Sequence, residues 1–170
     1  MNSGKAFVWI DRYLDTTRVG PRYLIQEPIA QLVLASLFRG VELGHYNLRR
    51  YVIMANHVHV LLFPRVAPSR LLGSLKGATA REANRILGST GKPFWQAESY
   101  DHWVRDEVEL NRIVAYIENN PVKAGLVQRG EDYRWSSAYL NPPSAETSLG
   151  AAGTSACATS AASRKPGAHQ

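Results

Sequence analysis

Two histidines separated by one residue, His57 and His59, are the most distinctive chemical feature of this sequence. They begin a run of apolar and β-branched residues, residues 57–63, that is typical of a strand. Because side chains alternate across a sheet, both imidazoles must project from the same face. Histidine is the commonest metal ligand in proteins, so this spacing favours a metal site. Two half-buried histidines bound to backbone carbonyls are the alternative explanation.

A second group of polar side chains has helical spacing. Tyr116 and Asn120 are four residues apart, and Arg112 precedes Tyr116 by four, so all three share one face of a predicted helix. A tyrosine hydroxyl can act as a nucleophile, and an amide oxygen can bind a metal. Pro121 disfavours a helical conformation at Asn120 and predicts a distorted last turn. The alternatives are ordinary packing for Tyr116 and helix termination for Asn120.

Both groups lie in segments that resemble a known family. Residues 51–63, YVIMANHVHVLLF, strongly resemble the HUH hairpin of REP-associated tyrosine transposases and of single-tyrosine insertion-sequence transposases. Residues 115–127, AYIENNPVKAGLV, resemble the tyrosine helix of the same proteins. Three shorter segments resemble lesser landmarks of the family: residues 74–76, 94–96 and 135–137. The likeness spans residues 46–139 in the expected order.

The resemblance implies a ferredoxin-like fold and metal-dependent cleavage and joining of single-stranded or hairpin-forming DNA. By position, His57 and His59 correspond to the two metal-binding histidines. Tyr116 corresponds to the nucleophile, which would form a 5′-phosphotyrosine and release a free 3′ hydroxyl. Asn120 stands where relatives place a polar residue near the metal, often glutamine, so we expect it to be the third ligand. The family suggests Mg²⁺ or Mn²⁺ as the cofactor.

The elements that position these residues alternate between strand and helix. The expected strands are residues 6–14, residues 46–54 and 57–63 joined as a hairpin, and a stretch within residues 94–105. Three helices are expected. The first begins at Pro28 and ends before Gly44, and the second begins at a Ser69 cap with Ile86 and Leu87 facing inward. The third begins at Asp106 and Glu109 in a capping-box arrangement. This order predicts an α+β, ferredoxin-like split-βαβ antiparallel sheet, with helices mainly on one face and an added C-terminal helix carrying Tyr116.

The composition favours a globular domain that binds a polyanion. Lysine and arginine outnumber aspartate and glutamate 20 to 14, which gives a formal charge of +6 and a pI near 9.7. Five basic residues are candidate phosphate contacts: Lys76, Arg81, Arg105, Arg112 and Lys123.

Residues 1–140 are the expected transposase domain, and residues 141–170, rich in Ala, Ser and Gly, are an expected disordered tail. No apolar run approaches the ~20 residues of a membrane span and no signal peptide is recognisable, so a cytoplasmic protein is expected.

The sequence leaves several alternatives open. The chain could be a domesticated protein that binds repeated palindromes, or a nuclease that uses metal-activated water while Tyr116 only packs. REP-associated relatives suggest a monomer, whereas insertion-sequence relatives suggest a homodimer. His102 could carry a proton, and Trp95 or Trp103 could stack on a base, although packing is the simpler role for each. The only cysteine, Cys157, disfavours a structural zinc site.

Overall fold

The computed structural model describes residues 5–10, 21–95 and 100–139. Its elements follow the expected order: β1 (Phe7–Ile10), α1 (Glu27–Glu42), β2 (Tyr46–Ile53), β3 (Val58–Pro64), α2 (Pro68–Ile86), β4 (Tyr100–Trp103) and α3 (Glu107–Lys123). Two short 3₁₀ turns are also described: Tyr23–Ile25, just before α1, and Gly130–Asp132, after α3. Residues 11–14 of the strand predicted over residues 6–14 lie outside the described residues, as does the tail predicted over residues 141–170.

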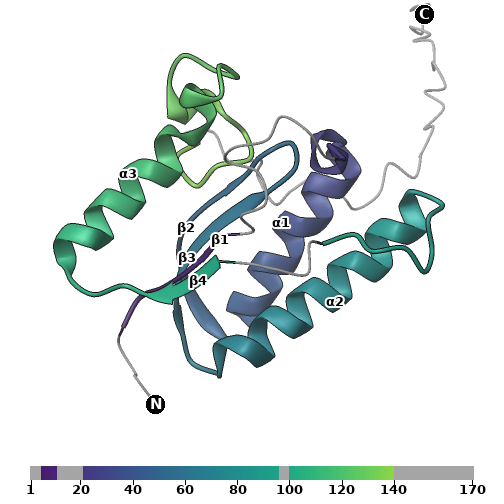
Figure 1. Ribbon diagram of the computed structural model, residues 1–170, viewed down its shortest axis with the longest axis horizontal. Coiled ribbons are helices and arrows are strands. Elements are labelled where there is room, and N and C mark those ends of the chain that lie inside the picture. The colour runs from purple at the N-terminus through teal and green to yellow at the C-terminus, as the bar shows by residue number, and fades with distance from the viewer. Residues whose placement is uncertain (1–4, 11–20, 96–99, 140–170) are drawn as a thin grey trace, which may run out of the picture.

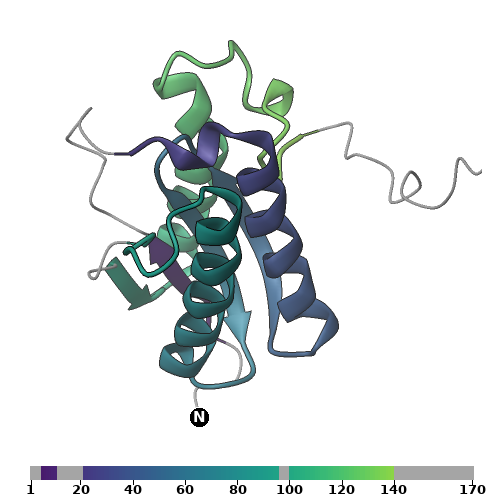
Figure 2. The same cartoon turned by 90° about the vertical axis from the view of Figure 1, so that its right-hand side faces the viewer.

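The four strands form one antiparallel sheet in the order β2-β3-β1-β4. This is the order of the ferredoxin-like split-βαβ arrangement, so the predicted fold class is confirmed. Helices α1 and α2 cover one face of the sheet, and α3 lies across the other (Figures 1 and 2). Two of the three helices therefore share a face, as expected, while the helix that carries Tyr116 is separated from them by the sheet.

Strand β3 is buried on both faces, which gives the protein two cores. Val58, Val60 and Leu62 pack towards α1 and α2. Leu61 packs towards α3, against Val8 and other apolar side chains. The histidines belong to the α3 face, because His59 is two residues from Leu61 in the same strand. The predicted sharing of one face by the two histidines follows from this alternation.

Two expectations for α2 are wrong. The helix begins at Pro68 with Ala67 as its N-cap, and Ser69 lies inside the first turn. Proline is favoured at the first helical position because it has no N–H to leave unbonded, so Pro68 sets the start. Ile86 is 40% exposed, whereas Leu87 packs against the core. The helix ends at Ile86, and the inward position of the last turn falls to Leu87.

The chain after α3 returns to the outer edge of β2. The backbone of Ile53 donates to the Trp135 carbonyl at 2.9 Å, and Ser137 donates to the Tyr51 carbonyl at 2.9 Å. The Tyr133 hydroxyl donates to the Ile53 carbonyl at 3.0 Å. This segment therefore covers part of an edge strand and connects α3 to the sheet. Within the described ranges, no helix is long and apolar enough to cross a lipid bilayer.

Candidate active site

The two histidines lie at the start of β3, beside the turn from β2. The turn is closed by the Met54 N–H, which donates to the His57 carbonyl at 2.8 Å. His57 and His59 are 8% and 1% exposed, and their ring centroids are 4.7 Å apart. Burial of two polar rings side by side is unusual for a surface hairpin and reflects the cover that α3 provides.

Hydrogen bonds orient both imidazoles. Oδ1 of Asn56 lies 2.8 Å from Nδ1 of His57, and because an amide oxygen can only accept, Nδ1 carries the proton there. Nδ2 of Asn120 lies 3.1 Å from Nε2 of His59, and because an amide nitrogen can only donate, that Nε2 presents its lone pair. Both contacts fit the tautomer in which Nδ1 carries the proton. Asn56 was not singled out from the sequence, although it directly precedes the histidine pair.

Helix α3 begins with the predicted cap. The Asp106 carboxylate accepts from the Glu109 N–H at 2.7 Å, and Glu109 accepts from the Arg105 N–H at 2.8 Å. Glu109 also accepts from the Arg105 guanidinium, which, with the backbone bond, lowers the pKa of the Glu109 carboxyl to about 2. In a standard capping box the Glu109 side chain would accept from the N–H of the N-cap residue, Asp106. Here it accepts from the N–H of Arg105, one residue earlier.

The same helix brings Tyr116 and Asn120 to the histidines. The Tyr116 ring stands at 90° to the His59 ring, with 5.3 Å between the centroids. The Lys123 ammonium lies 4.9 Å from the centre of the Tyr116 ring, within the range of a cation–π contact. Two segments far apart in the sequence thus form one polar cluster, which consists of His57, His59, Tyr116, Asn120 and Lys123.

The helix continues through Pro121 to Lys123, so the expected distortion of the last turn is not seen. Asn120 is helical and 6% exposed. The C-terminal carbonyls remain bonded, because Asn120 accepts from the Ala124 N–H and Pro121 accepts from the Leu126 N–H, each at 3.0 Å. Packing of buried Pro121 and Asn120 overrides the local preference before proline.

The five basic candidates are not gathered in one place. Lys123 lies at the cluster, and exposed Arg112 lies one turn before Tyr116 on α3. Arg105 is paired with Glu109 at 3.1 Å at the start of α3. Lys76 and Arg81 lie on α2, across the sheet, where the Lys76 ammonium is 5.8 Å from the Trp9 ring.

The other side chains considered from the sequence lie outside the cluster. His102 is on β4, two strands from β3, with Nε2 3.4 Å from the Glu109 carboxylate. Trp95 donates to the Thr79 hydroxyl at 2.7 Å. The Trp103 ring packs edge-on against Phe7 at 5.3 Å. These contacts favour packing for both tryptophans.

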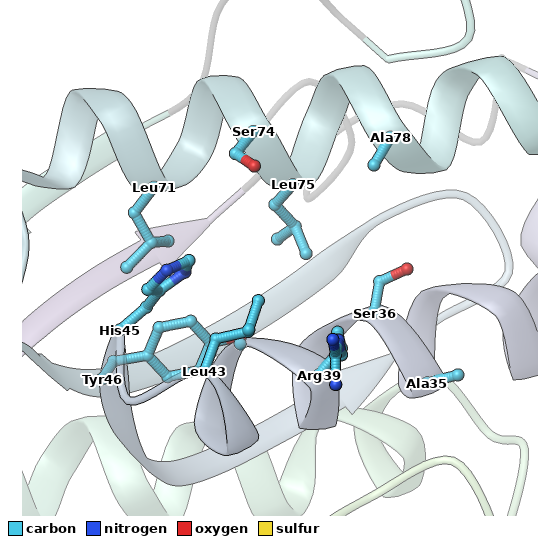
Figure 3. Close-up of a pocket in the computed structure, with 11 residues that line it drawn as sticks. Ala35, Ser36, Arg39, Leu43, His45, Tyr46, Leu71, Ser74, Leu75 and Ala78 are labelled. Atoms are coloured by element: carbon cyan, nitrogen blue, oxygen red, sulfur yellow. The ribbon is translucent and has the colours of Figure 1, made fainter.

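A cavity of about 400 Å³ opens between α1 and α2 (Figure 3). It is lined by Ser36 and Arg39 of α1, Ser74 and Leu75 of α2, and His45 of the connecting loop. Its floor belongs to the core beneath α1 and α2, across the sheet from the histidines. The cavity is therefore lined by none of the residues of the polar cluster.

The polar cluster offers few side chains that could bind a metal ion. Among the described residues, no group of three His, Cys, Asp or Glu side chains could hold a metal ion. A metal at this place would therefore need Asn120 or solvent beside the two imidazoles. Two nitrogens and an amide oxygen would suit a divalent ion of intermediate softness and leave positions open for a substrate.

Comparison with known proteins gives a family match and several structural neighbours, among them the following two. The family model "Transposase IS200 like" matches residues 22–120, which include every residue of the cluster except Lys123. The solved structure of a REP-associated tyrosine transposase bound to a REP hairpin has a TM-score of 0.61 at 20% identity, covering 80% of this chain and 77% of that one. A candidate transposase from Deinococcus radiodurans R1 has a TM-score of 0.46 at 22% identity, covering 68% of this chain and 90% of that one. No functionally curated protein matches the chain.

Proposed function

This chain belongs to the family of IS200-like transposases, and we propose that it cleaves and rejoins DNA strands with Tyr116 as the nucleophile. The convergence of Tyr116 and Asn120 with His57 and His59 at one buried spot carries the proposal. The structural neighbour that holds a REP hairpin supports single-stranded or hairpin-forming DNA as the substrate. All four side chains come from one chain, which supports a site that is complete in a monomer.

The side chains fit a divalent metal, Mg²⁺ or Mn²⁺. The Nδ1 proton of His57 is held by Asn56, and a metal-binding histidine commonly donates its other ring N–H in this way. His59 also presents Nε2, which faces the Asn120 amide at 3.1 Å. A half turn of that amide exchanges its nitrogen for its oxygen, so Asn120 can serve as the third ligand. Imidazoles suit Mn²⁺ better than Mg²⁺, which prefers oxygen.

The chemistry divides between the metal and the chain. A bound metal would neutralise the phosphate oxygens and stabilise the charge that develops on them. The Tyr116 oxygen attacks phosphorus, the bond from phosphorus to the 3′ oxygen breaks, and the released 3′ oxygen takes a proton. Tyr116 loses its own proton and becomes joined to the 5′ phosphate. Because the phosphodiester energy is kept in this link, attack by a 3′ hydroxyl rejoins a strand without ATP.

The basic residues divide between the two faces of the sheet. Lys123 and Arg112 lie on the catalytic face beside Tyr116, so we assign them to phosphates near the cleaved bond. Lys76 and Arg81, across the sheet on α2, suit a more distant part of the DNA, such as the stem of a hairpin. Arg105 is held by Glu109 and is the weakest of the candidates.

Covalent capture tests the proposal. The full chain is incubated with Mn²⁺ and a hairpin oligonucleotide labelled on the 3′ side of candidate cleavage sites, and denaturing electrophoresis follows. A protein–DNA adduct that survives denaturation supports the tyrosine mechanism. Cleavage without an adduct supports the water-using nuclease, and DNA binding without cleavage supports a domesticated DNA-binding protein.

A further inference from the structure

An ion pair joins the sheet to α3 within one helical turn of the proposed nucleophile. Nε of Arg50, on β2, lies 2.6 Å from Oε1 of Glu118, on α3. Glu118 is two residues from Tyr116 on one side and two from Asn120 on the other. We propose that Arg50 and Glu118 are positioning residues that hold α3 in the rotation and register that place Tyr116 over the histidines. The inference rests on the proposed function of Tyr116.

Apolar packing alone leaves this register weakly specified. Ile117 and its neighbours on α3 pack against Val8, Val52 and Leu61 of the sheet. Such contacts are nondirectional, so small slides or rotations of a helix cost little. In-line attack requires reacting atoms to be placed to a fraction of an ångström. A charge-assisted hydrogen bond between fixed elements supplies the direction that packing lacks.

A β-bulge in β2 aims Arg50 at α3. Leu48 pairs with Leu62 and packs beneath α1 and α2, whereas Arg50 pairs with Leu61, which packs beneath α3. In an uninterrupted strand residues 48 and 50 would share a face. Arg49 is the extra residue that breaks this alternation. Bulges commonly re-aim a side chain near an active site, and this one places the guanidinium on the catalytic face.

Other contacts hold both members of the pair. The Arg50 guanidinium also donates to the Arg49 carbonyl at 2.8 Å, which limits its freedom. Gly130, in the segment after α3, approaches the Glu118 carbonyl so closely that a Cβ at this position would clash with it. The segment that returns to β2 thus contacts the same turn of α3. Arg50 and Glu118 are 30% and 33% exposed, and half-exposed pairs contribute little to stability, so a positioning role fits better than a stabilising one.

The test uses Arg50→Gln, Glu118→Gln and the exchanged double variant Arg50→Glu/Glu118→Arg, each in the full chain. Glu42→Gln, which removes an exposed ion pair on α1, is the matched control. We expect each single variant to slow adduct formation roughly tenfold or more, because small misplacements of reacting groups have large effects. Affinity for the hairpin and the melting temperature should stay near the parent values. The exchanged variant should recover most of the rate, and the control should match the parent.

A second measurement does not depend on activity. The eight tyrosines are labelled with 3-fluorotyrosine, and the Tyr116 resonance is assigned by its loss in Tyr116→Phe. The resonance should move in the single variants, return towards its parent position in the exchanged variant, and stay unchanged in the control. If the parent forms no adduct, the proposed function fails, and this spectrum still decides the positioning role. An unmoved resonance, an exchanged variant no better than the single ones, or single variants that merely unfold would overturn the inference.

Discussion

The Asn120 amide nitrogen lies 3.1 Å from Nε2 of His59, although the two residues are 61 positions apart in the chain. The contact joins the last turn of α3 to the start of β3, beside the place where the Tyr116 ring meets the His59 ring. It also places the side-chain amide of Asn120 beside the proposed metal-binding imidazoles.

We predict that Asn120→Ala weakens Mn²⁺ binding by at least about tenfold, the usual lower range for losing a group that supports a metal site. Asn120→Asp should bind Mn²⁺ more tightly than the parent, because a carboxylate oxygen adds charge to the amide's place. Isothermal titration calorimetry of the full chain measures both. Equal affinity in Asn120→Ala and the parent would remove Asn120 from the ligand set.

Replacing either histidine separates cleavage from DNA binding. His57→Ala or His59→Ala should abolish cleavage of a hairpin oligonucleotide, because each removes a proposed metal ligand. Affinity for the oligonucleotide should remain within a few-fold, since lysine and arginine contacts to phosphate supply most of it. Gel shift and cleavage assays on the same samples measure the two properties. Chelation should mimic the variants and be reversed by Mn²⁺, and cleavage by the double variant would disprove the assignment.

Tyr116→Phe removes only the proposed nucleophilic oxygen. The ring still packs edge-on to His59 and beneath Lys123, so the melting temperature and hairpin affinity should be nearly unchanged. Both the covalent adduct and strand cleavage should disappear. Denaturing electrophoresis distinguishes the outcomes, because a nuclease that uses water would cut at a rate near that of the parent.

The N-terminal cap of α3 should make the stability of the fold depend on pH in the acid range. Hydrogen bonds from Arg105 lower the pKa of Glu109 from 4.5 to about 2 in the folded chain. A lowered folded pKa means that the stabilisation is fully present above pH 4.5 and is lost as the pH falls towards 2. Thermal melts between these values should show a smaller drop for Glu109→Gln than for the parent. Parallel pH dependence in the two proteins would contradict this role of the carboxylate.

Removal of residues 141–170 should leave the melting temperature unchanged, because this segment lacks the apolar periodicity needed to contribute to a core. Differential scanning calorimetry of the shortened chain measures it. A large decrease would show that the segment packs on the domain. Weaker DNA binding at low salt would be compatible with loss of Arg164 and Lys165.

The sequence determined the features that depend on short-range geometry. Alternation along a strand put His57 and His59 on one face, and helical spacing put Tyr116 and Asn120 on one face. The side chains of Asp106 and Glu109 marked the start of α3, as the structure confirms. These rules hold because the backbone periodicities of helices and strands do not depend on distant neighbours. Even so, local preference failed at Pro121 and at Ser69, where packing or a competing start signal prevailed.

Only the tertiary structure decided on which side of the sheet each helix lies and which side chains face each other. It put α3 on the opposite side of the sheet from α1 and α2, and it separated Lys76 and Arg81 from Tyr116. The bulge that turns Arg50 towards Glu118, a residue 68 positions away, has no local signature in the sequence. The physical reason is that packing between elements depends on the summed burial of many side chains. One extra residue in β2 changes which of them face each other.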